Sequence, residues 1–381
     1  MNALTKDPWL FTPGPLTTSA ETKEAMLRDW GSRDATFIET NRRIRLQLLD
    51  LADATDTHAC VPVQGSGTFA VEATLGTLIK DTDKTLVLVN GAYGTRIVRI
   101  LEVLGKSTLS IETAEDTPND LIQLAQQLEH DPDITHVVAV HCETTSGILN
   151  PLSEISNLVS KHGRKLIIDA MSAFGALPLS AREIQFEALI ASSNKCLEGV
   201  PGLGFAIIET QALEASKGNS PSLCLDLYDQ WQNMEKTSQW RFTPPTHVIA
   251  ALDCALAQLI AEGGPPGRLA RYTNNCRVLV AGMKKMGFEP LLPDAIQAPI
   301  IITFKIPSDP NFIFEQFYDH LKAQGFVIYP GKLTVAETFR MGCIGHMHEE
   351  QMLSLISAVD RTLDQMGIST PLISNSLTSP N

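Results

Sequence analysis

The most reactive side chain suggested by this sequence is a lysine surrounded by small, uncharged residues. Lys195 lies in the stretch SSNKCLEGVPG (192–202), whose serines and glycines leave room for a ligand close to the backbone. An amine in a dry, neutral site loses its proton more easily and becomes a nucleophile. The alternative is a surface lysine whose aliphatic stem lies along apolar side chains.

A carboxylate precedes this lysine by one strand–helix–strand unit. Asp169 follows the apolar run KLII (165–168), and a carboxylate at the end of a buried strand is costly unless it has a partner. The side chain could cap the helix that follows. It could also face a cationic ring nitrogen in a ligand.

Three further stretches place polar or aromatic groups directly after an apolar run. GSGT (65–68) opens a predicted helix, and it could hold a phosphate at the positive end of the helix dipole or simply form a cap and a turn. Tyr93, in NGAYG (90–94), could stack on a flat ring or lie in a surface turn. HCETTSG (141–147) offers oxygens for a ligand or for helix capping.

These features are weak one by one but consistent when they are combined. In an open parallel sheet, ligands bind beyond the carboxyl ends of the strands, so groups that follow different strands meet at one edge. A phosphate cradle, a ring stacker, a carboxylate and an amine together match pyridoxal 5′-phosphate. Its aldehyde would form a Schiff base with Lys195, and Asp169 would keep its ring nitrogen protonated so that the ring acts as an electron sink.

The elements that must position these residues form an alternating pattern of strands and helices. Continuous apolar runs of this length suit a sheet buried on both faces, and strands that alternate with helices predict an α/β fold with a mostly parallel sheet. Helical patterns separate the runs, for example at 67–79 and 154–163. The seven apolar runs are 59–63, 85–89, 108–112, 136–140, 165–169, 188–192 and 204–208.

The pattern changes after about residue 245 and predicts a second, smaller α+β domain. GGPPG (263–267) separates two long predicted helices. The segments that follow read as strand, helix, two strands and a last helix, at 299–306, 311–324, 325–332, 338–345 and 348–366. We therefore predict a large domain at 15–262, a small domain made of 1–14 and 263–369, and a flexible tail at 370–381.

Composition and charge limit the partners and the compartment. The 381-residue chain has a net charge of −13, which disfavours nucleic acids and anionic membranes as partners. Its seven cysteines are scattered and form no CxxC, which favours reduced thiols in the cytoplasm. We find no signal-peptide core and no apolar run near the roughly 18 residues of a membrane span. An anionic small substrate would need local arginines, and candidates are Arg33, Arg241 and Arg340.

Several motifs, in order, resemble the class V branch of the fold-type I pyridoxal-phosphate aminotransferases. The resemblance runs from LFTPGPL (10–16) to TFRMGCIG (338–345). Within the branch, SSNKCLEGVPG and YPGKLTVAETFRMG (329–342) are most similar to the members that act on 2-aminoethylphosphonate and pyruvate. The alternative is a member that acts on alanine or serine with glyoxylate or pyruvate. The shared motifs between these ends are GSGT, NGAYG, HCETTSG, IIDAMSAFG, SSNKCLEGVPG and RFTPPTHVI (241–249).

The resemblance implies a role for each matching cofactor residue. Lys195 would attach the cofactor and move the proton, while Asp169 would pair with the pyridine nitrogen. Tyr93 would stack on the ring, and Thr144 would contact the side of the ring that carries the hydroxyl. The phosphate would be held by Ser66, Gly67 and Thr68, and the pocket would be further lined by Met171 and Asn194.

The resemblance also implies a homodimer and a substrate anchor. Thr243 would reach the phosphate of the neighbouring subunit's cofactor, which places the active sites at the subunit interface. Arg340 would hold the anionic end of the substrate, because a guanidinium binds a phosphonate or a carboxylate as a fork. Alternatively, Arg340 forms a structural ion pair. Arg33 is a second anion contact or, as we favour, an exposed charge.

More distant alternatives are a lyase or desulfurase, and a non-catalytic or nucleotide-binding α/β protein. A desulfurase needs a mobile nucleophilic cysteine, whereas Cys196, beside the lysine, is expected to pack in the core. The stretch GSGTFA (65–70) lacks the third glycine of the dinucleotide-binding fingerprint, and no acidic residue follows at the usual distance.

Overall fold

The computed structural model describes residues 7–331 and 336–372, and it divides into two compact units. The larger unit comprises Thr18–Glu143 and Leu149–Leu269. The smaller unit comprises Met1–Thr17, Thr144–Ile148 and Ala270–Asn381. The domain borders expected from the sequence stay a prediction. The expected flexible tail lies outside the described residues from 373 onward, as do residues 332–335 of the motif at 329–342.

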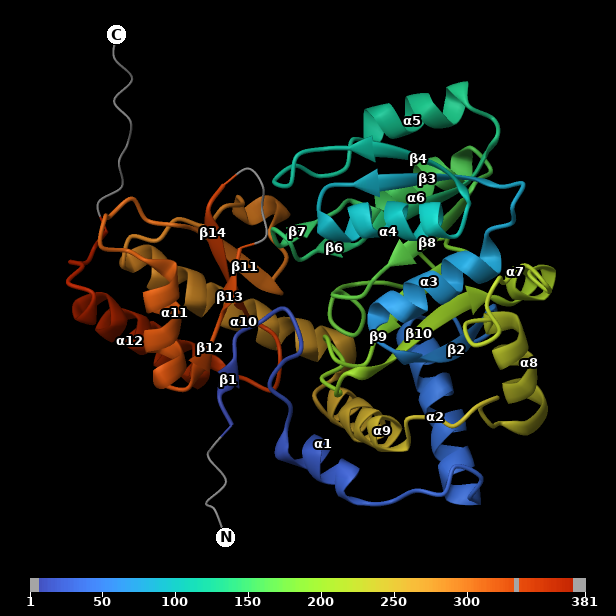
Figure 1. Cartoon of the computed structure of the whole chain (residues 1–381), viewed down its shortest axis with the longest axis horizontal. Coiled ribbons are helices and arrows are strands. Elements are labelled where there is room, and N and C mark those ends of the chain that lie inside the picture. The colour runs from blue at the N-terminus through green and yellow to red at the C-terminus, as the bar shows by residue number, and fades with distance from the viewer. Residues whose placement is uncertain (1–6, 332–335, 373–381) are drawn as a thin grey trace. The chain divides into compact units, whose positions relative to one another are not determined.

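The larger unit is built on a seven-stranded sheet, which Figure 1 shows with helices packed against it. The strand order is β2-β10-β9-β8-β5-β3-β4. β10 runs antiparallel to both of its neighbours, and the other neighbouring pairs are parallel. All seven predicted strands are present, as β2 (His58–Gly65), β3 (Lys84–Val89), β4 (Ser107–Glu112), β5 (Ile134–Val140), β8 (Lys165–Asp169), β9 (Ala188–Ser192) and β10 (Gly202–Glu209).

The strands read as continuous apolar runs because both faces of the sheet are covered. All five residues of β9 are buried. Ala188 and Ile190 pack in a core cluster with residues of the helices α3 and α4, while Leu189 and Ala191, which point to the opposite face, are buried as well. The prediction of a mostly parallel, doubly covered sheet is therefore confirmed.

Three helices of the larger unit begin at an aspartate cap. Asp34, Asp120 and Asp226 each accept a backbone N–H in the first turn of the helix that follows. The helices are α1 (Ala20–Glu24), η1 (Ala25–Leu27), α2 (Ala35–Leu51), α3 (Gly67–Leu78), α4 (Ala92–Val103), α5 (Leu121–His130), α6 (Leu152–Lys161), α7 (Thr210–Ala215), α8 (Leu227–Thr237) and α9 (Thr246–Ala261).

The break between the two long helices is shorter than the sequence suggested. α9 ends at Ala261, and α10 (Gly264–Lys285) begins within GGPPG rather than near residue 268. Prolines are tolerated in the first turn of a helix, where an N–H has no intrahelical acceptor. Among the residues that the structure describes, no single helix is long and apolar enough to cross a membrane, and α9 and α10 pass that test only as a pair bent by 83°.

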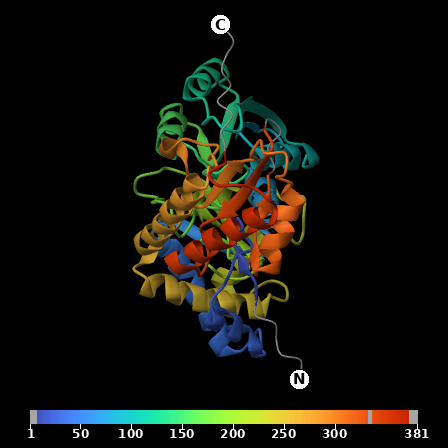
Figure 2. The same cartoon turned by 90° about the vertical axis from the view of Figure 1, so that its left-hand side faces the viewer.

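The smaller unit packs the later part of α10, two further helices and short strands around an aromatic core. The strands β11 (Ile301–Lys305), β14 (Thr338–Gly342) and β13 (Tyr329–Pro330) form one sheet, and β1 (Trp9–Leu10) pairs with β12 (Phe326–Val327). The helices α11 (Phe314–Ala323) and α12 (Glu349–Gln365) lie side by side, as Figure 2 shows. Phe304 and Phe339 stack in the core with Phe288 against their edges. The remaining elements are β6 (Cys142–Glu143), β7 (Ile148–Leu149) and η2 (Asp294–Ile296).

Candidate active site

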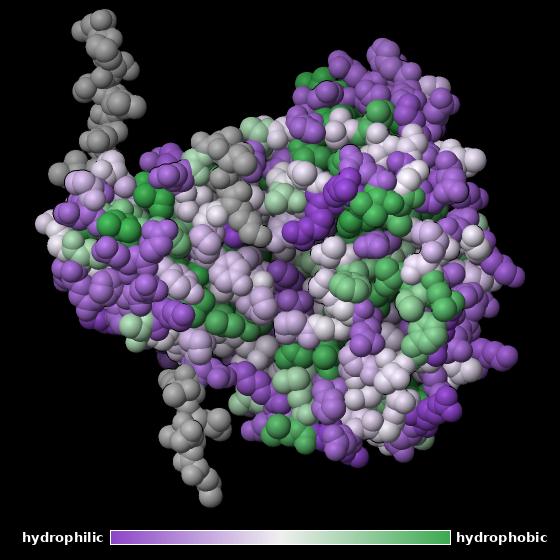
Figure 3. All heavy atoms as spheres, in the orientation of Figure 1, coloured by the Kyte–Doolittle hydropathy of each residue, from purple (hydrophilic) through white to green (hydrophobic). Residues whose placement is uncertain are grey.

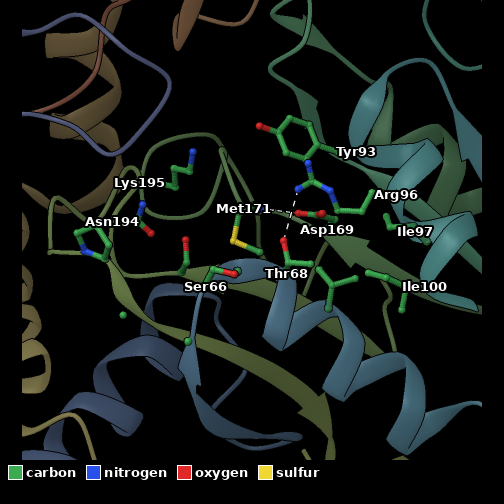
Figure 4. A pocket seen from close by; sticks show the side chains of 16 residues that line it. Ser66, Thr68, Tyr93, Arg96, Ile97, Ile100, Asp169, Met171, Asn194 and Lys195 are labelled. Carbon is green, nitrogen blue, oxygen red and sulfur yellow. Dashed lines mark hydrogen bonds between the residues drawn. The ribbon is translucent and has the colours of Figure 1, made fainter. Parts of the chain in front are cut away.

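One cavity of the larger unit, of about 470 Å³, is lined by residues that follow the ends of four strands. These strands are β2, β3, β8 and β9, all of which run in the same direction. The residues come together because parallel strands end at one edge of the sheet. Figure 4 shows the side chains around this space. The predicted site residues that line it are Ser66, Gly67, Thr68, Tyr93, Asp169, Met171, Asn194 and Lys195.

The amino end of α3 forms the predicted cradle for an anion. Gly65 has a φ of +130°, a conformation that favours glycine, and it turns the chain from β2 into the helix. Within the described part of the chain, the side chain of the N-cap residue Ser66 makes no capping hydrogen bond, so the helix does not use its hydroxyl. A Cβ at Gly67 would lie 2.3 Å from the Met171 sulfur. The Met171 side chain thus lies against Gly67, and a larger residue at this position would collide with it.

Tyr93 is held at the amino end of α4 by Glu143, a buried carboxylate of the stretch HCETTSG, for which the sequence analysis left ligand binding and helix capping open. Glu143 is fully buried, and one of its oxygens accepts the N–H of Tyr93 at 3.0 Å and that of Gly94 at 3.4 Å. It thereby does the work of a helix cap, because the N-cap residue Gly91 has no side chain to accept these donors. A Cβ at Gly91 would lie 2.4 Å from the Glu143 carboxyl carbon.

Asp169 is the last residue of β8 and is buried at the cavity wall. Its carboxylate accepts the Met171 N–H at 2.9 Å. Loss of solvation by burial raises the pKa of Asp169 to about 6, against the smaller lowering effects of the Met171 N–H and of the charges on Lys195 and Arg96. The ionised carboxylate is therefore destabilised in this position, and a cationic partner would stabilise it.

Lys195 follows β9 on a tight loop and lines the same cavity as Asp169. Ser193 secures the start of this loop, since its hydroxyl donates to the Leu203 carbonyl at 3.1 Å and its N–H donates to the same oxygen at 3.0 Å. At the other end, the Glu198 N–H donates to the Lys195 carbonyl at 2.8 Å. In Figure 4, Lys195 lies on the opposite side of Met171 from Asp169.

Two further residues of the cavity were missed by sequence reasoning. Arg96 lies one helical turn after Tyr93, with its guanidinium carbon 5.0 Å from the centre of the Tyr93 ring, and Nη1 donates to Thr68 Oγ1 at 3.4 Å. Its spacing of three from Tyr93 on a helix was the available signal. Ser192 is buried, and its hydroxyl has no hydrogen-bond partner among the described residues.

One predicted cofactor residue lines a different cavity. Thr243 lies beside a second cavity of the larger unit, of about 490 Å³, together with Phe69 and Phe242. Gly65 borders both cavities. The structure therefore does not bring Thr243 into the lining of the cavity around Lys195.

Two other predicted residues belong to the smaller unit, where they contact each other. Arg340 is buried on β14, and its Nη1 donates to the Thr144 carbonyl at 2.8 Å while its Nε donates to the Pro330 carbonyl at 3.1 Å. The Thr144 hydroxyl is buried and has no hydrogen-bond partner within residues 7–331 and 336–372. The roles expected of both residues stay predictions. Arg33 is exposed, and its role stays a prediction.

The residues around Lys195 fit pyridoxal 5′-phosphate. The cradle at Gly67 has no room for a Cβ, the Ser192 hydroxyl has no partner among the residues that the structure describes, and an amine and a buried carboxylate line the same space as an aromatic ring. These are the groups that a phosphate, an aldehyde and a basic ring nitrogen require. The donor set is thus consistent with a covalently attached aromatic aldehyde.

Comparisons with known proteins identify the class. The sequence model of the family described as aminotransferase class-V matches residues 18–310, so the chain belongs to the class-V aminotransferase family. A structure of ureidoglycine–glyoxylate aminotransferase from Bacillus subtilis aligns with a TM-score of 0.89 at 22% identity, covering 97% of this chain and 96% of that one. At that identity the likeness shows the fold alone, and it confirms the predicted fold-type I architecture.

Two curated relatives are much more similar in sequence. The 2-aminoethylphosphonate–pyruvate transaminase of Pseudomonas fluorescens strain Pf-5 is 54% identical over 362 residues, which cover 95% of this chain and 98% of the relative. The transaminase of the same name from strain Pf0-1 is 55% identical over 364 residues, covering 96% and 99%. The prediction of a class V aminotransferase is thereby confirmed.

Proposed function

We propose that this protein is a pyridoxal-phosphate-dependent aminotransferase that converts 2-aminoethylphosphonate and pyruvate to phosphonoacetaldehyde and L-alanine. The observation that carries the proposal is that Lys195, Asp169 and the amino end of α3 line one cavity. The choice of substrates is supported by relatives more than half identical over nearly the whole chain.

The amino end of α3 and the two ionisable side chains divide the work of holding the cofactor. When bound, pyridoxal phosphate supplies an aromatic ring that takes up the electron pair released at the carbon that bears the amino group. The N–H groups of Gly67 and Thr68, with the helix dipole behind them, bind its phosphate. The carboxylate of Asp169 binds the protonated ring nitrogen, which relieves the cost of burying the carboxylate alone.

Lys195 attaches the cofactor and then moves the proton. Lys195 would hold the cofactor through its amine, and during the reaction the same amine would take the proton from the substrate carbon that bears nitrogen. The wall of the cavity also has an apolar part, which includes Ile97 and Ile100. The two substrates react in turn at this one site.

Arg340 anchors the anionic end of each substrate. A guanidinium forms the same forked pair of hydrogen bonds with a phosphonate as with a carboxylate, so a single arginine serves 2-aminoethylphosphonate and then pyruvate. The bonds from Arg340 to the Thr144 and Pro330 carbonyls orient the guanidinium before any substrate binds. The buried Thr144 hydroxyl is available for the cofactor's ring hydroxyl.

A second copy of the chain completes the enzyme. Large apolar side chains are exposed on the larger unit near Thr243. Phe69 and Phe242, which line the same cavity as Thr243, are 51% and 50% exposed, and Leu223, next to Cys224 of that lining, is 70% exposed. Figure 3 shows hydrophobic residues gathered on the face of this unit that is turned to the viewer. In a homodimer these side chains would be covered, and Thr243 would reach the neighbour's cofactor phosphate.

The remaining expectations about partners and compartment are part of the same proposal. A net charge of −13 supports a small-molecule enzyme without nucleic acid or membrane partners. Cys60, Cys142, Cys196 and Cys343 are buried thiols, which supports a reducing compartment such as the cytoplasm.

A spectral titration with single amines tests the choice of substrate. Only a true amino donor converts the bound cofactor from its aldehyde to its amine form, so 2-aminoethylphosphonate should bleach the visible band, and pyruvate, which accepts the amino group, should restore it. The alternative substrates, alanine or serine with glyoxylate, are titrated in parallel. Conversion by serine but not by 2-aminoethylphosphonate would overturn the proposed substrate while leaving the cofactor in place.

Substitution of the lysine tests the chemistry. Lys195→Ala should abolish both half-reactions and the visible band of the attached cofactor, because the nucleophile and the proton carrier are lost together. Lys161→Ala, at an exposed lysine at the end of α6, is the matched control and should retain both. A Lys195→Ala protein that still transaminates at the original rate would refute the proposal.

A further inference from the structure

The loop that carries Lys195 contains a glutamate in a backbone conformation that favours glycine. Glu198 has a φ of +60°, one of three non-glycine positions with positive φ among the described residues, and its side chain is buried. Residues with a Cβ are strained in this conformation, and glycine is not. A buried charge is a further cost. A contact within the fold must therefore stabilise Glu198 against both the strained φ and the burial of its charge.

Its partner is a fully buried arginine. The Arg268 side chain on α10 is 1% exposed, and its Nη1 lies 3.6 Å from Glu198 Oε1. Its Nε donates to Glu262 Oε2 at 2.7 Å, which ties the guanidinium to the residue directly after α9. Arg268 belongs to the larger unit, as do both glutamates.

The same guanidinium also reaches the backbone next to the lysine. Nη1 of Arg268 donates a hydrogen bond to the carbonyl of Cys196, the residue that follows Lys195. The loop is closed from the other side, because the Glu198 N–H donates to the Lys195 carbonyl at 2.8 Å and the Gly199 N–H donates to the Ser193 carbonyl at 2.8 Å. Arg268 therefore grips the loop at two points, the Cys196 carbonyl and the Glu198 carboxylate.

We propose that Arg268 and Glu198 are positioning residues that fix the backbone of Lys195, so that its amine reaches both the cofactor and the substrate carbon. Proton transfer depends steeply on geometry, and a displacement of about 1 Å can cost about a hundredfold in rate. Glycine at position 198 would avoid the strained φ, but it has no side chain that could bind Arg268, whereas the carboxylate of Glu198 can. This inference rests on the proposed role of Lys195.

Glu198→Gly separates positioning from folding. Glycine adopts a φ of +60° without strain, and Arg268 keeps Glu262 as a partner, so the variant should fold. Substituting Arg268 itself would leave two carboxylates without it and is less informative. Asp53→Gly is the matched control, because Asp53 is exposed, has a φ of +51° and lies outside the cavity.

The holoenzyme is measured for kcat, KM and the pH at which the visible band of the Lys195-bound cofactor shifts. We expect Glu198→Gly to bind the cofactor, to lose about tenfold or more in kcat with a smaller change in KM, and to move the midpoint of the band. Glu198→Gln keeps a polar oxygen at the position of Oε1, which lies 3.6 Å from Arg268 Nη1, and should restore most of the rate. Asp53→Gly should match the wild type in all three quantities.

Two results would overturn the inference. One is a Glu198→Gly enzyme with the kcat and the band midpoint of the wild type, since the glutamate would then serve only the turn. The other is an equal loss of kcat in Glu198→Gly and Glu198→Gln, since the contact between residue 198 and Arg268 would then not position Lys195. Absence of the band and of transamination in the wild type would instead refute the proposed function.

Discussion

The substitution Asp169→Asn should stabilise the cofactor-free protein while weakening the enzyme. Asn retains an oxygen that can accept the Met171 N–H, now at 2.9 Å from the carboxylate, and it removes the charge. The charge is the costly part, since burial raises the pKa of Asp169 from its usual 3.8 to about 6. The effect should therefore depend on pH.

The magnitude follows from the shift in pKa. A rise from 3.8 to about 6 is roughly two units, which at about 1.4 kcal/mol per unit corresponds to about 3 kcal/mol. Because the folded pKa lies above the unfolded one, the folded protein holds a proton between pH 4 and 6 that the unfolded chain has released. The free energy of unfolding of the wild type therefore falls as pH rises through this window, and the full cost is present above pH 6.

The assay compares urea unfolding of the two cofactor-free proteins between pH 4 and 7.5. At pH 4 the wild type and Asp169→Asn should differ little through this group, whereas at pH 7.5 the variant should be more stable by up to about 3 kcal/mol. Asp53→Asn, at an exposed aspartate, is the control and should show no such trend. In the cofactor-loaded protein the order should reverse, because the carboxylate then pairs with the ring nitrogen.

A difference between wild type and Asp169→Asn that stays constant from pH 4 to 7.5 would refute this reasoning. It would mean that the carboxylate is solvated or already paired within the chain. A variant that binds pyridoxal phosphate as tightly as the wild type would refute the proposed pairing with the ring nitrogen.

Three further predictions concern the cradle and the subunit contact. Arg96→Gln should raise the Kd of pyridoxal phosphate about tenfold without changing that of pyridoxal, because Arg96 is a permanent positive charge in the cavity lining; equal effects on both ligands would contradict this. Gly67→Ala should weaken cofactor binding in a fluorescence titration while the fold persists, since the new Cβ would lie 2.3 Å from the Met171 sulfur; unchanged affinity would show that Met171 yields. Phe242→Asp should shift sedimentation from dimer to monomer, because Phe242 is half exposed near Thr243; an intact dimer would place the interface elsewhere.

The strands were predictable because each is a short apolar run, and the runs are apolar because both faces of the sheet are covered. The start of α10 was misplaced because its two prolines look like a break, although the first turn of a helix accepts them. The break itself was correctly placed by the glycines at 263–264, both of which have positive φ. Local residue chemistry thus predicted where elements exist better than where they begin.

The site was predictable only in part. Lys195, Asp169 and Tyr93 could be found because each follows a strand whose carboxyl end faces the ligand edge of the sheet. Glu143 and Arg96 could not be assigned, because a carboxylate that caps a helix fifty residues earlier and a cation that reaches back to Thr68 are contacts across strands. No local pattern records such contacts.

By itself the sequence determined the strand–helix alternation and the amine, carboxylate and glycines that chemistry on a phosphorylated ring would use. These are properties of short segments, set by hydrophobic pattern and backbone freedom. Only the tertiary structure decided how burial shifts the pKa of Asp169 and which distant residues hold the lysine loop. Desolvation and the ion pair between Arg268 and Glu198 depend on which groups lie close together in space. The residues next to a group in the chain do not specify those neighbours.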